Sequence, residues 1–210
     1  MITLYGTPKS RALRASWLLE ELGIDWDFHF INFAKADNRS AQFLSINPGG
    51  KVPVLVDDDF VLTESAAICL YLAEKYGQGK LLPQAGTAQS AKHHEWVSFI
   101  ITELEQPLWT MGKHRFALPE SQRQEVMLEV AKWEFDKAAA LAESKLPNTP
   151  FLLGDEISVA DILLAHTLIW ATMFKQNIPT KLAAYRDRIQ ARASFTSAIE
   201  KTEAIAAANG

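Results

Sequence analysis

Hydrophobic positions in the first 76 residues follow both the two-residue period of strands and the longer period of helices. Residues 2–5 form a short apolar run that predicts a buried strand. The apolar side chains of residues 13–22 recur at helical spacing and stop at Gly23, a common helix terminator. Residues 26–30 alternate between apolar and polar side chains and predict a second strand. A strand, a helix and a strand in this order predict a parallel pair joined by a right-handed crossover.

A hairpin and a further helix complete this first half. Apolar residues at 52–56 and 60–62 flank three consecutive aspartates, a pattern typical of a β-hairpin. A short helix is expected around residues 41–44, and a longer one over residues 65–76 that ends at Gly77.

From Gln89 onward, every periodic segment has helical spacing. Three helices carry apolar stripes, which normally face a core, and two more fit residues 179–190 and 195–207. The stripes are Trp96, Phe99, Ile100, Leu104 and Leu108 in the first helix, Val126, Val130, Trp133, Phe135 and Leu141 in the second, and Ile162, Leu163, His166, Ile169 and Trp170 in the third.

The change of period predicts two domains. We expect an α/β domain over residues 1–77, a linker over residues 78–87 and an all-helical domain over residues 88–210. The stretch from 77 to 86 carries three glycines and a proline, which is typical of a linker. A chain of 210 residues, 48% of them hydrophobic, is long enough to fill the cores of both domains.

Charge and cysteine content restrict the classes of partner. Lys and Arg total 21 against 25 for Asp and Glu, which gives a net charge of -4, and no run of like charge favours nucleic acid. Cys69 is the one cysteine, so no disulfide can form within the chain. No segment reads as a secretory leader, and the most apolar stretch, residues 162–174, is too short to span a membrane. We therefore expect a cytoplasmic protein without a nucleic-acid or membrane partner.

Pro53 stands inside the predicted strand 52–56, where a proline cannot donate a ladder hydrogen bond. Sequence statistics favour an edge strand with a trans proline, because cis is the minority isomer. The alternative is a cis Val52-Pro53 bond, which turns the amide and carbonyl of Val52 away from the ladder. A free backbone donor and acceptor of this kind can bind a peptide as an added strand.

Motif context favours the cis alternative. The segment NPGGKVPVL at residues 47–55, followed by LTESAAI at residues 62–68, resembles the signature of the cytosolic glutathione transferases. In that signature an N-P-x-G-x-V-P segment precedes an E/Q-S-x-A-I segment. The resemblance extends over the whole chain and implies a thioredoxin-like α/β domain followed by an all-α domain, the glutathione transferase fold. It also implies a homodimer, of a bacterial, serine-type class.

The resemblance implies how glutathione would be held. The backbone of Val52 would meet the cysteinyl unit, with cis-Pro53 enforcing the shape. Glu64 and Ser65 would hold the amine and carboxylate of the γ-glutamyl unit, and Lys51 is a candidate partner for the glycyl carboxylate. Without the family, residues 64 and 65 would be read as a helix cap and Lys51 as a solvated loop lysine. The helix beginning at Ser65 does favour a carboxylate on general grounds.

The chemistry of such an enzyme requires a thiolate, whereas a free thiol has a pKa of about 8.5. Ser10 lies between the first strand and the first helix, so its hydroxyl can donate to sulfur while the helix N-terminus adds a favourable field. Ser10 is therefore our catalytic candidate, although read alone it is an ordinary N-cap. Tyr5 or a backbone amide could take this role instead. Arg11 and Arg14 are candidates for supporting positive potential.

A serine where some relatives carry a cysteine disfavours disulfide exchange and favours conjugation, peroxide reduction or isomerisation. The predicted function is transfer of glutathione to an apolar electrophile, with glutathione as co-substrate and no metal. The alternatives are a glutathione-dependent peroxidase or isomerase, or a non-catalytic ligand-binding or regulatory protein of the same fold. We expect the electrophile between the domains. The candidate residues for its pocket are Trp109, His114, Arg115 and Trp170.

Three other polar groups have structural interpretations. Residues 57–59, all aspartates, are typical of a hairpin turn rather than a metal site. His93 and His94 are adjacent, cannot face one ion, and are expected at the surface. Ser158 and Asp161 have the spacing of a capping box.

Overall fold

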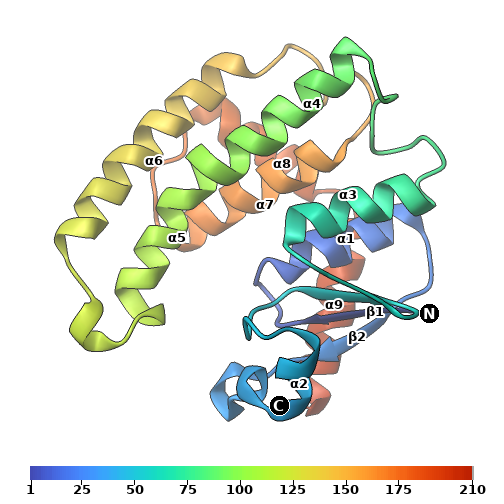
Figure 1. Ribbon diagram of the computed structural model, residues 1–210. Coiled ribbons are helices and arrows are strands. Elements are labelled where there is room, and N and C mark those ends of the chain that lie inside the picture. Colours follow the sequence, from blue (N-terminus) through green and yellow to red (C-terminus); the bar gives the residue numbers. More distant parts are fainter. Residues whose placement is uncertain (210) are drawn as a thin grey trace. The chain divides into compact units, whose positions relative to one another are not determined.

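The structure, a computed structural model, describes residues 1–209. Contacts divide the chain into two compact units (Figure 1). Unit 1 comprises Met1–Leu82 and the chain from Gln190 onward, and unit 2 comprises Pro83–Ile189.

Unit 1 is built on a mixed sheet with strand order β2-β1-β3-β4. The central β1 pairs parallel with β2 and antiparallel with β3, and β3 forms a hairpin with β4. The crossover and hairpin predicted from the hydrophobic pattern are thus both confirmed. Leu4 and Leu55 face each other across β1 and β3 and are fully buried, which places the core on the central strands. The strands are β1 (Ile2–Gly6), β2 (Asp27–Phe30), β3 (Val54–Asp57) and β4 (Phe60–Thr63).

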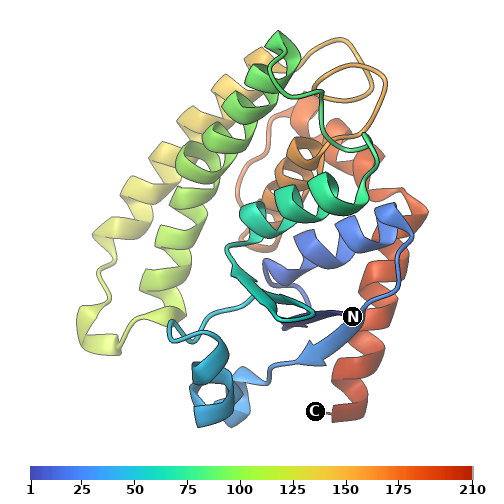
Figure 2. The same cartoon turned by 45° about the vertical axis from the view of Figure 1, so that its right-hand side comes forward.

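Four α-helices complete unit 1, together with the short 3₁₀ turns Phe33–Lys35 and Asp37–Arg39. Helices α1 and α3 pack side by side (Figure 2). Gly23 ends α1 in the left-handed conformation, with φ of 64°, as its position in the sequence predicts. The helices are α1 (Ala12–Leu22), α2 (Ala41–Ile46), α3 (Ser65–Tyr76) and α9 (Ala193–Asn209).

Helix α9, which the sequence pattern assigns to the helical segment 88–210, packs on α1 and β2 within unit 1. The rings of Trp17 and Phe195 lie 4.7 Å apart, and the Trp17 indole donates to Ser194 at 3.2 Å. Lys201 covers Trp26, with its ammonium 4.0 Å from the ring centroid. The chain therefore returns to its first unit, a long-range arrangement that local periodicity does not report.

Unit 2 is helical throughout its regular elements. Helix α4, a π-helical stretch and helix α5 follow one another without a break. Helices α4 and α5 lie alongside α6 (Figure 1). The elements are α4 (Ala88–Phe99), the π-helix Ile100–Glu105, α5 (Gln106–Gly112), the π-helix Lys113–Ala117, the 3₁₀ turn Glu120–Gln122, α6 (Val126–Lys145), α7 (Val159–Met173) and α8 (Thr180–Gln190).

The stripe expected to face the core in α6 lies on the outside. Trp133 is 64% exposed and Val126 60%, and Val130 and Leu141 are exposed as well. Of the five predicted residues only Phe135 is buried, and the rest of the buried face consists of alanines. Small side chains let α6 approach its neighbours closely, but they contribute little to a hydrophobic pattern, so the larger residues dominated the prediction.

Several polar side chains hold the start of α7. The predicted capping box forms, with Asp161 Oδ2 accepting from the Ser158 amide at 2.7 Å, and the Tyr185 hydroxyl donates to the same carboxylate. His93 was wrongly expected at the surface. Its ring is 1% exposed, and Nε2 accepts from the Ala160 amide at 3.3 Å, so this histidine fixes α7 from α4.

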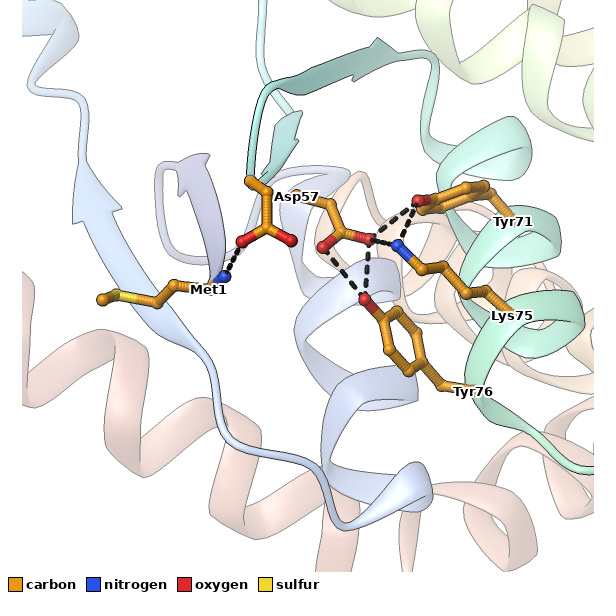
Figure 3. Close-up of polar contacts among 6 residues, drawn as sticks. Met1, Asp57, Tyr71, Lys75 and Tyr76 are labelled. Atoms are coloured by element: carbon orange, nitrogen blue, oxygen red, sulfur yellow. Dashed lines mark hydrogen bonds and ion pairs between the residues drawn. The ribbon is translucent and has the colours of Figure 1, made fainter.

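The predicted aspartate turn contains one buried carboxylate (Figure 3). Asp57, at the end of β3, accepts from the hydroxyls of Tyr71 and Tyr76 and from Lys75, each at 2.7 Å. Burial alone would raise the pKa of Asp57, but these three hydrogen bonds outweigh it and hold the pKa below its ordinary value. Asp58 pairs with the N-terminal ammonium of Met1. The first aspartate thus ties the sheet to α3.

Candidate functional site

The backbone of Val52 is open, as the cis interpretation predicts. The Val52-Pro53 bond is cis. Neither the amide nor the carbonyl of Val52 forms a hydrogen bond with any residue that the structure describes. The Val52 side chain packs instead against the small core around Phe43 and Val54. The Val52 side chain is therefore fixed by packing, while its backbone amide and carbonyl remain available to a ligand.

The loop before Val52 is fixed by short-range hydrogen bonds. Asn47 accepts from the Gly49 amide at 3.0 Å and donates to the Lys51 carbonyl at 2.8 Å. Asn38 donates to the carbonyl of Gly50 at 2.9 Å. Gly50 has φ of 62°, and a Cβ there would lie 2.9 Å from the Asn38 carbonyl oxygen, so only glycine fits. Lys51 is exposed at the end of this loop.

Glu64 and Ser65 form the junction between β4 and α3. Glu64 has φ of 68° and ψ of 111°, a conformation that is unfavourable for a residue with a Cβ. No side chain caps α3, and the amides of its first three residues donate to no described residue. Such an N-terminus favours an anion. Ser65 is buried, and its hydroxyl accepts from the fully buried guanidinium of Arg14 at 3.1 Å.

Ser10 lies just before α1, whose N-cap residue is Arg11. The Ser10 hydroxyl accepts from the Ala12 amide at 3.2 Å and donates to the Thr7 carbonyl at 2.6 Å. It therefore caps the helix with its oxygen and uses its proton in the preceding turn. A Cβ at Gly6 would lie 2.5 Å from that of Ala12, so glycine is what allows α1 to start so close to the end of β1.

Tyr5 belongs to the sheet rather than to this turn. Its ring lies 4.6 Å from that of His29 and 6.2 Å from that of Phe43. It packs against the same small core as Val52. Tyr5 thus packs among the strands, whereas Ser10 lies at the start of α1.

Strand register brings the predicted segments of unit 1 together. Tyr5 pairs with Val54, and Val54 pairs with Thr63. The chain that follows β1, the chain that precedes β3 and the chain that follows β4 therefore leave the sheet at one edge. Ser10, Val52-Pro53 and Glu64-Ser65 lie in these three segments. Residues dispersed over more than fifty positions in the sequence thus share one edge of the sheet.

The four candidates for the electrophile pocket divide into two groups in unit 2. Trp170 and Arg115 both contact Phe174, with centroid distances of 5.7 Å and 4.9 Å. Trp109 lies near Gly112, as does Phe174. His114 is turned to the next loop, where its Nδ1 accepts from the Gln124 amide at 3.1 Å.

Sequence reasoning missed two features of these regions. Arg14 was expected either to add positive potential or to lie on a solvated face, whereas it is fully buried and its guanidinium donates to Ser65, a residue 51 positions away. Unit 2 also carries a pocket of about 340 Å³ along α6, with Trp133, Glu103 and Glu134 among its lining residues. The one signal for this pocket is the surplus of large apolar residues on α6.

The described residues contain no metal-ligand cluster, no reactive cysteine and no membrane-spanning helix. No cluster of three or more potential metal-ligating His, Cys, Asp or Glu residues occurs among residues 1–209. Burial raises the pKa of the Cys69 thiol to about 12, which makes this cysteine a poor nucleophile. None of the helices described combines the length and apolar character needed to cross a bilayer.

Unit 1 combines a thioredoxin-like sheet with a cis-proline whose preceding backbone is open, and the chain continues into a helical unit. This combination is typical of the glutathione transferase fold. The family models for the N-terminal and C-terminal domains of glutathione S-transferase match residues 1–74 and 105–193. The chain belongs to the glutathione S-transferase family.

Individual relatives agree over most of the chain. It is 34% identical over 170 residues to glutathione S-transferase GstB of Escherichia coli K12, covering 79% of this chain and 80% of the relative. It is 32% identical to glutathione S-transferase theta-1 of Bos taurus, over 90% of this chain and 82% of the relative. A glutathione transferase crystal structure from Methylococcus capsulatus matches with a TM-score of 0.86 at 30% identity, covering 97% and 99% of the two chains.

Proposed function

We propose that this chain, a glutathione transferase by family, ionises glutathione at the sheet edge of unit 1 and transfers it to a small apolar electrophile. The observation that carries the proposal is the convergence of three segments on that edge. They supply an open strand backbone, an uncapped helix N-terminus and a serine hydroxyl.

Each part of glutathione has a chemically matched partner in this proposal. The unused amide and carbonyl of Val52 pair with the backbone of the cysteinyl unit, in the manner of an added strand. The amides at the start of α3 and the Ser65 hydroxyl receive the γ-glutamyl carboxylate. Glu64, which is exposed, accepts from the γ-glutamyl ammonium, and Lys51 pairs with the glycyl carboxylate.

Ser10 stabilises the thiolate by turning its hydroxyl proton from the Thr7 carbonyl to the sulfur. In the free protein this proton is donated to the Thr7 carbonyl, a neutral hydrogen bond worth about 1 kcal/mol. A hydrogen bond to a charged sulfur is worth about 1.5–3 kcal/mol, so rotation of the hydroxyl toward sulfur is favourable. After loss of the bond to Thr7, the exchange supplies about 0.5–2 kcal/mol. The helix N-terminus adds about 0.3–2 kcal/mol, so a decrease of about one to two units in the thiol pKa is within reach, at about 1.4 kcal/mol per unit.

The transfer step then balances without a further reactant. The thiol releases its proton to solvent, and the thiolate electron pair forms a bond from sulfur to the electrophilic carbon. On an aryl halide the carbon–halogen bond breaks, and the halide leaves with its electron pair. The product is a thioether of glutathione and free halide.

Two measurements test this function. The ultraviolet absorbance of glutathione thiolate is titrated in the presence of the protein, where we expect an apparent thiol pKa well below the free value of about 8.5. Turnover is then compared on an aryl halide, an organic hydroperoxide and a maleyl-type substrate, with the aryl halide expected to react best. An unshifted thiol pKa would instead indicate a binding protein.

Ser10→Ala separates the serine from the rest of the site. Conjugation should fall ten-fold or more, while glutathione is still retained on an affinity resin. Ser45→Ala is the matched control, because Ser45 also donates to a carbonyl of its own turn but lies in α2. Unchanged turnover in Ser10→Ala would transfer the role to Tyr5 or to a backbone amide.

We also infer a homodimer formed through α6. Its outer apolar stripe leaves large side chains in water, and such patches commonly mark interaction surfaces. Glu134 and Lys137 flank Trp133, so two copies of α6 packed antiparallel would place unlike charges opposite each other. Sedimentation should give a dimer for the wild type and a monomer for Trp133→Glu, and a wild-type monomer would refute the interface.

The cellular role that we propose is detoxification in the cytoplasm. Conjugation consumes reactive electrophiles and converts them to charged, water-soluble thioethers. A free thiol at Cys69 and a thiol co-substrate both suit a reducing compartment. Fractionation of cells with an antibody to the chain would test the location.

A further inference from the structure

A cation lies on an aromatic group in unit 2. We name this group the Phe174 cluster, consisting of Phe174, Phe116, Trp170 and Arg115. The rings of Phe116 and Trp170 meet Phe174 edge-on, at 6.3 Å and 5.7 Å. The guanidinium carbon of Arg115 lies 4.9 Å from the Phe174 centroid. One aromatic ring therefore joins two others and a positive charge.

The backbone around the cluster is held in place. Arg123 donates to the carbonyl oxygens of Phe116 and Leu118, at 3.1 Å and 2.9 Å, and so braces the turn that follows Arg115. Gly112 lies beneath the cluster, and a Cβ there would meet the Phe116 and Phe174 rings at 3.4 Å and 3.7 Å. The backbone that carries Arg115 and Phe116 is thus held from both sides.

The charge of Arg115 has no counterion in the described part of the chain. The Arg115 side chain forms neither an ion pair nor a hydrogen bond with any residue there, and its guanidinium interacts with the Phe174 ring. Lys113 and Lys175, which flank the cluster in the sequence, likewise pair with no carboxylate among the described residues. Glu120 and Glu125, the first two acidic residues that follow Arg115 in the chain, form no ion pair with a described residue either. The guanidinium on the Phe174 ring is therefore available to an anionic group of a ligand.

We propose that Arg115 selects aromatic electrophiles that carry an anionic substituent, such as a carboxylate or sulfonate. This specificity rests on the proposed transfer function. The planar guanidinium can donate one hydrogen bond to each oxygen of a carboxylate. The rings of Phe174 and Trp170 can pack against the aromatic ring of the substrate. A neutral apolar electrophile uses only the aromatic part. The substrate class is thereby narrowed from apolar compounds in general to amphipathic aromatic acids.

The test compares 4-chloro-3,5-dinitrobenzoate with its methyl ester, which share a reacting carbon and differ in charge. The kcat/KM of the full chain is divided, for each compound, by the uncatalysed rate with glutathione, which removes the difference in intrinsic reactivity. We expect the acid-to-ester ratio to exceed one for the wild type and to fall about ten-fold in Arg115→Met. Arg115→Lys, which keeps the charge but loses the fork, should give an intermediate ratio.

Lys113→Met is the matched control. It removes the same charge from the same π-helical turn, but Lys113 forms no cation–π contact with the Phe174 ring, so its acid-to-ester ratio should stay close to that of the wild type. An equal loss in both variants would reduce the effect to general electrostatics and overturn the assignment. A wild-type ratio at or below one, or an unchanged ratio in Arg115→Met, overturns it as well. Failure to conjugate any aryl halide would instead refute the proposed function.

Discussion

Helices α3 and α7 begin in opposite ways, and the difference separates binding from folding. At α7 the capping box, the Tyr185 hydroxyl and the buried His93 all serve the first turn and its surroundings. At α3 no side chain caps the amides, and the preceding Glu64 has an unfavourable backbone conformation. Helix ends normally have their free amides satisfied by side chains, water or a ligand. The closed end therefore secures unit 2, and the open end is suited to a ligand.

The two ends also treat charge differently. Burial holds the pKa of Asp161 above its ordinary value, even though Ser158 and Tyr185 donate to it. At α3 the charged partner, Arg14, reaches the helix through a serine hydroxyl and leaves the amides uncovered. An anion at α3 would thus meet both a helix dipole and a positioned hydroxyl.

The largest loss of stability should come from removing the Asp161 carboxylate at the start of α7. Asp161→Ala removes the acceptor of the Leu152 amide, the Ser158 amide and hydroxyl, and the Tyr185 hydroxyl. Several buried donors then lack a partner, and we expect a loss of about 3 kcal/mol or more in the free energy of unfolding. Urea denaturation measures this loss. A loss below about 1 kcal/mol would show that water replaces the carboxylate and that the end is not closed.

His93 gives the second prediction, through pH. Its Nε2 can accept from Ala160 only in the neutral form, and burial, with a smaller effect from His94, lowers the pKa of His93 to about 4. In the unfolded chain the pKa is about 6.5. Stability should therefore be complete above about pH 6.5 and should fall by about 1.4 kcal/mol per pH unit as the pH drops toward 4.

The measurement is urea denaturation at several values between pH 6.5 and pH 5, a range that avoids most carboxylate titration. His93→Gln keeps an acceptor but cannot titrate in this range, so its slope should be smaller. His94→Gln is the control, since His94 is exposed and should leave most of the slope intact. Equal slopes in wild type and His93→Gln would contradict the assigned role.

Much of unit 1 could be predicted because its signals are local. The strand alternation, Gly23 and the E-S dipeptide at the start of α3 are each read within a few residues, and the predicted range 65–76 matches α3. The motif around Pro53 likewise predicted the cis bond. The role of Arg14 was not predictable, because its contact with Ser65 depends on the packing of α1 on α3.

Unit 2 shows where local patterns fail. Hydrophobicity identified α6 but assigned it the wrong buried face, because alanines pack inside while Trp133 and Val126 remain outside. His93 looks polar in the sequence, yet it is buried because a helix end in another element needs an acceptor. The first error follows from the small size of alanine, and the second from a hydrogen-bond partner that lies 67 positions away in the sequence.

The smallest expected effect tests the open end directly. Glu64→Gly removes the side chain from a residue with φ of 68°, a conformation that glycine adopts at little cost. Relief of this strain should raise the free energy of unfolding by about 1 kcal/mol, although the greater freedom of glycine in the unfolded chain offsets part of the gain. Glutathione affinity should fall, because the acceptor that we propose for the γ-glutamyl ammonium is lost.

Ser158→Ala provides the mirror image at the closed end, with a loss of about 1 kcal/mol in stability and no change in glutathione affinity. Both variants are measured by urea denaturation and by calorimetric titration with glutathione. Opposite signs in stability, with affinity lost only in Glu64→Gly, would establish that one helix start is shaped for a ligand and the other for folding. If Glu64→Gly loses stability and keeps its affinity, the strained residue serves the hairpin rather than the ligand.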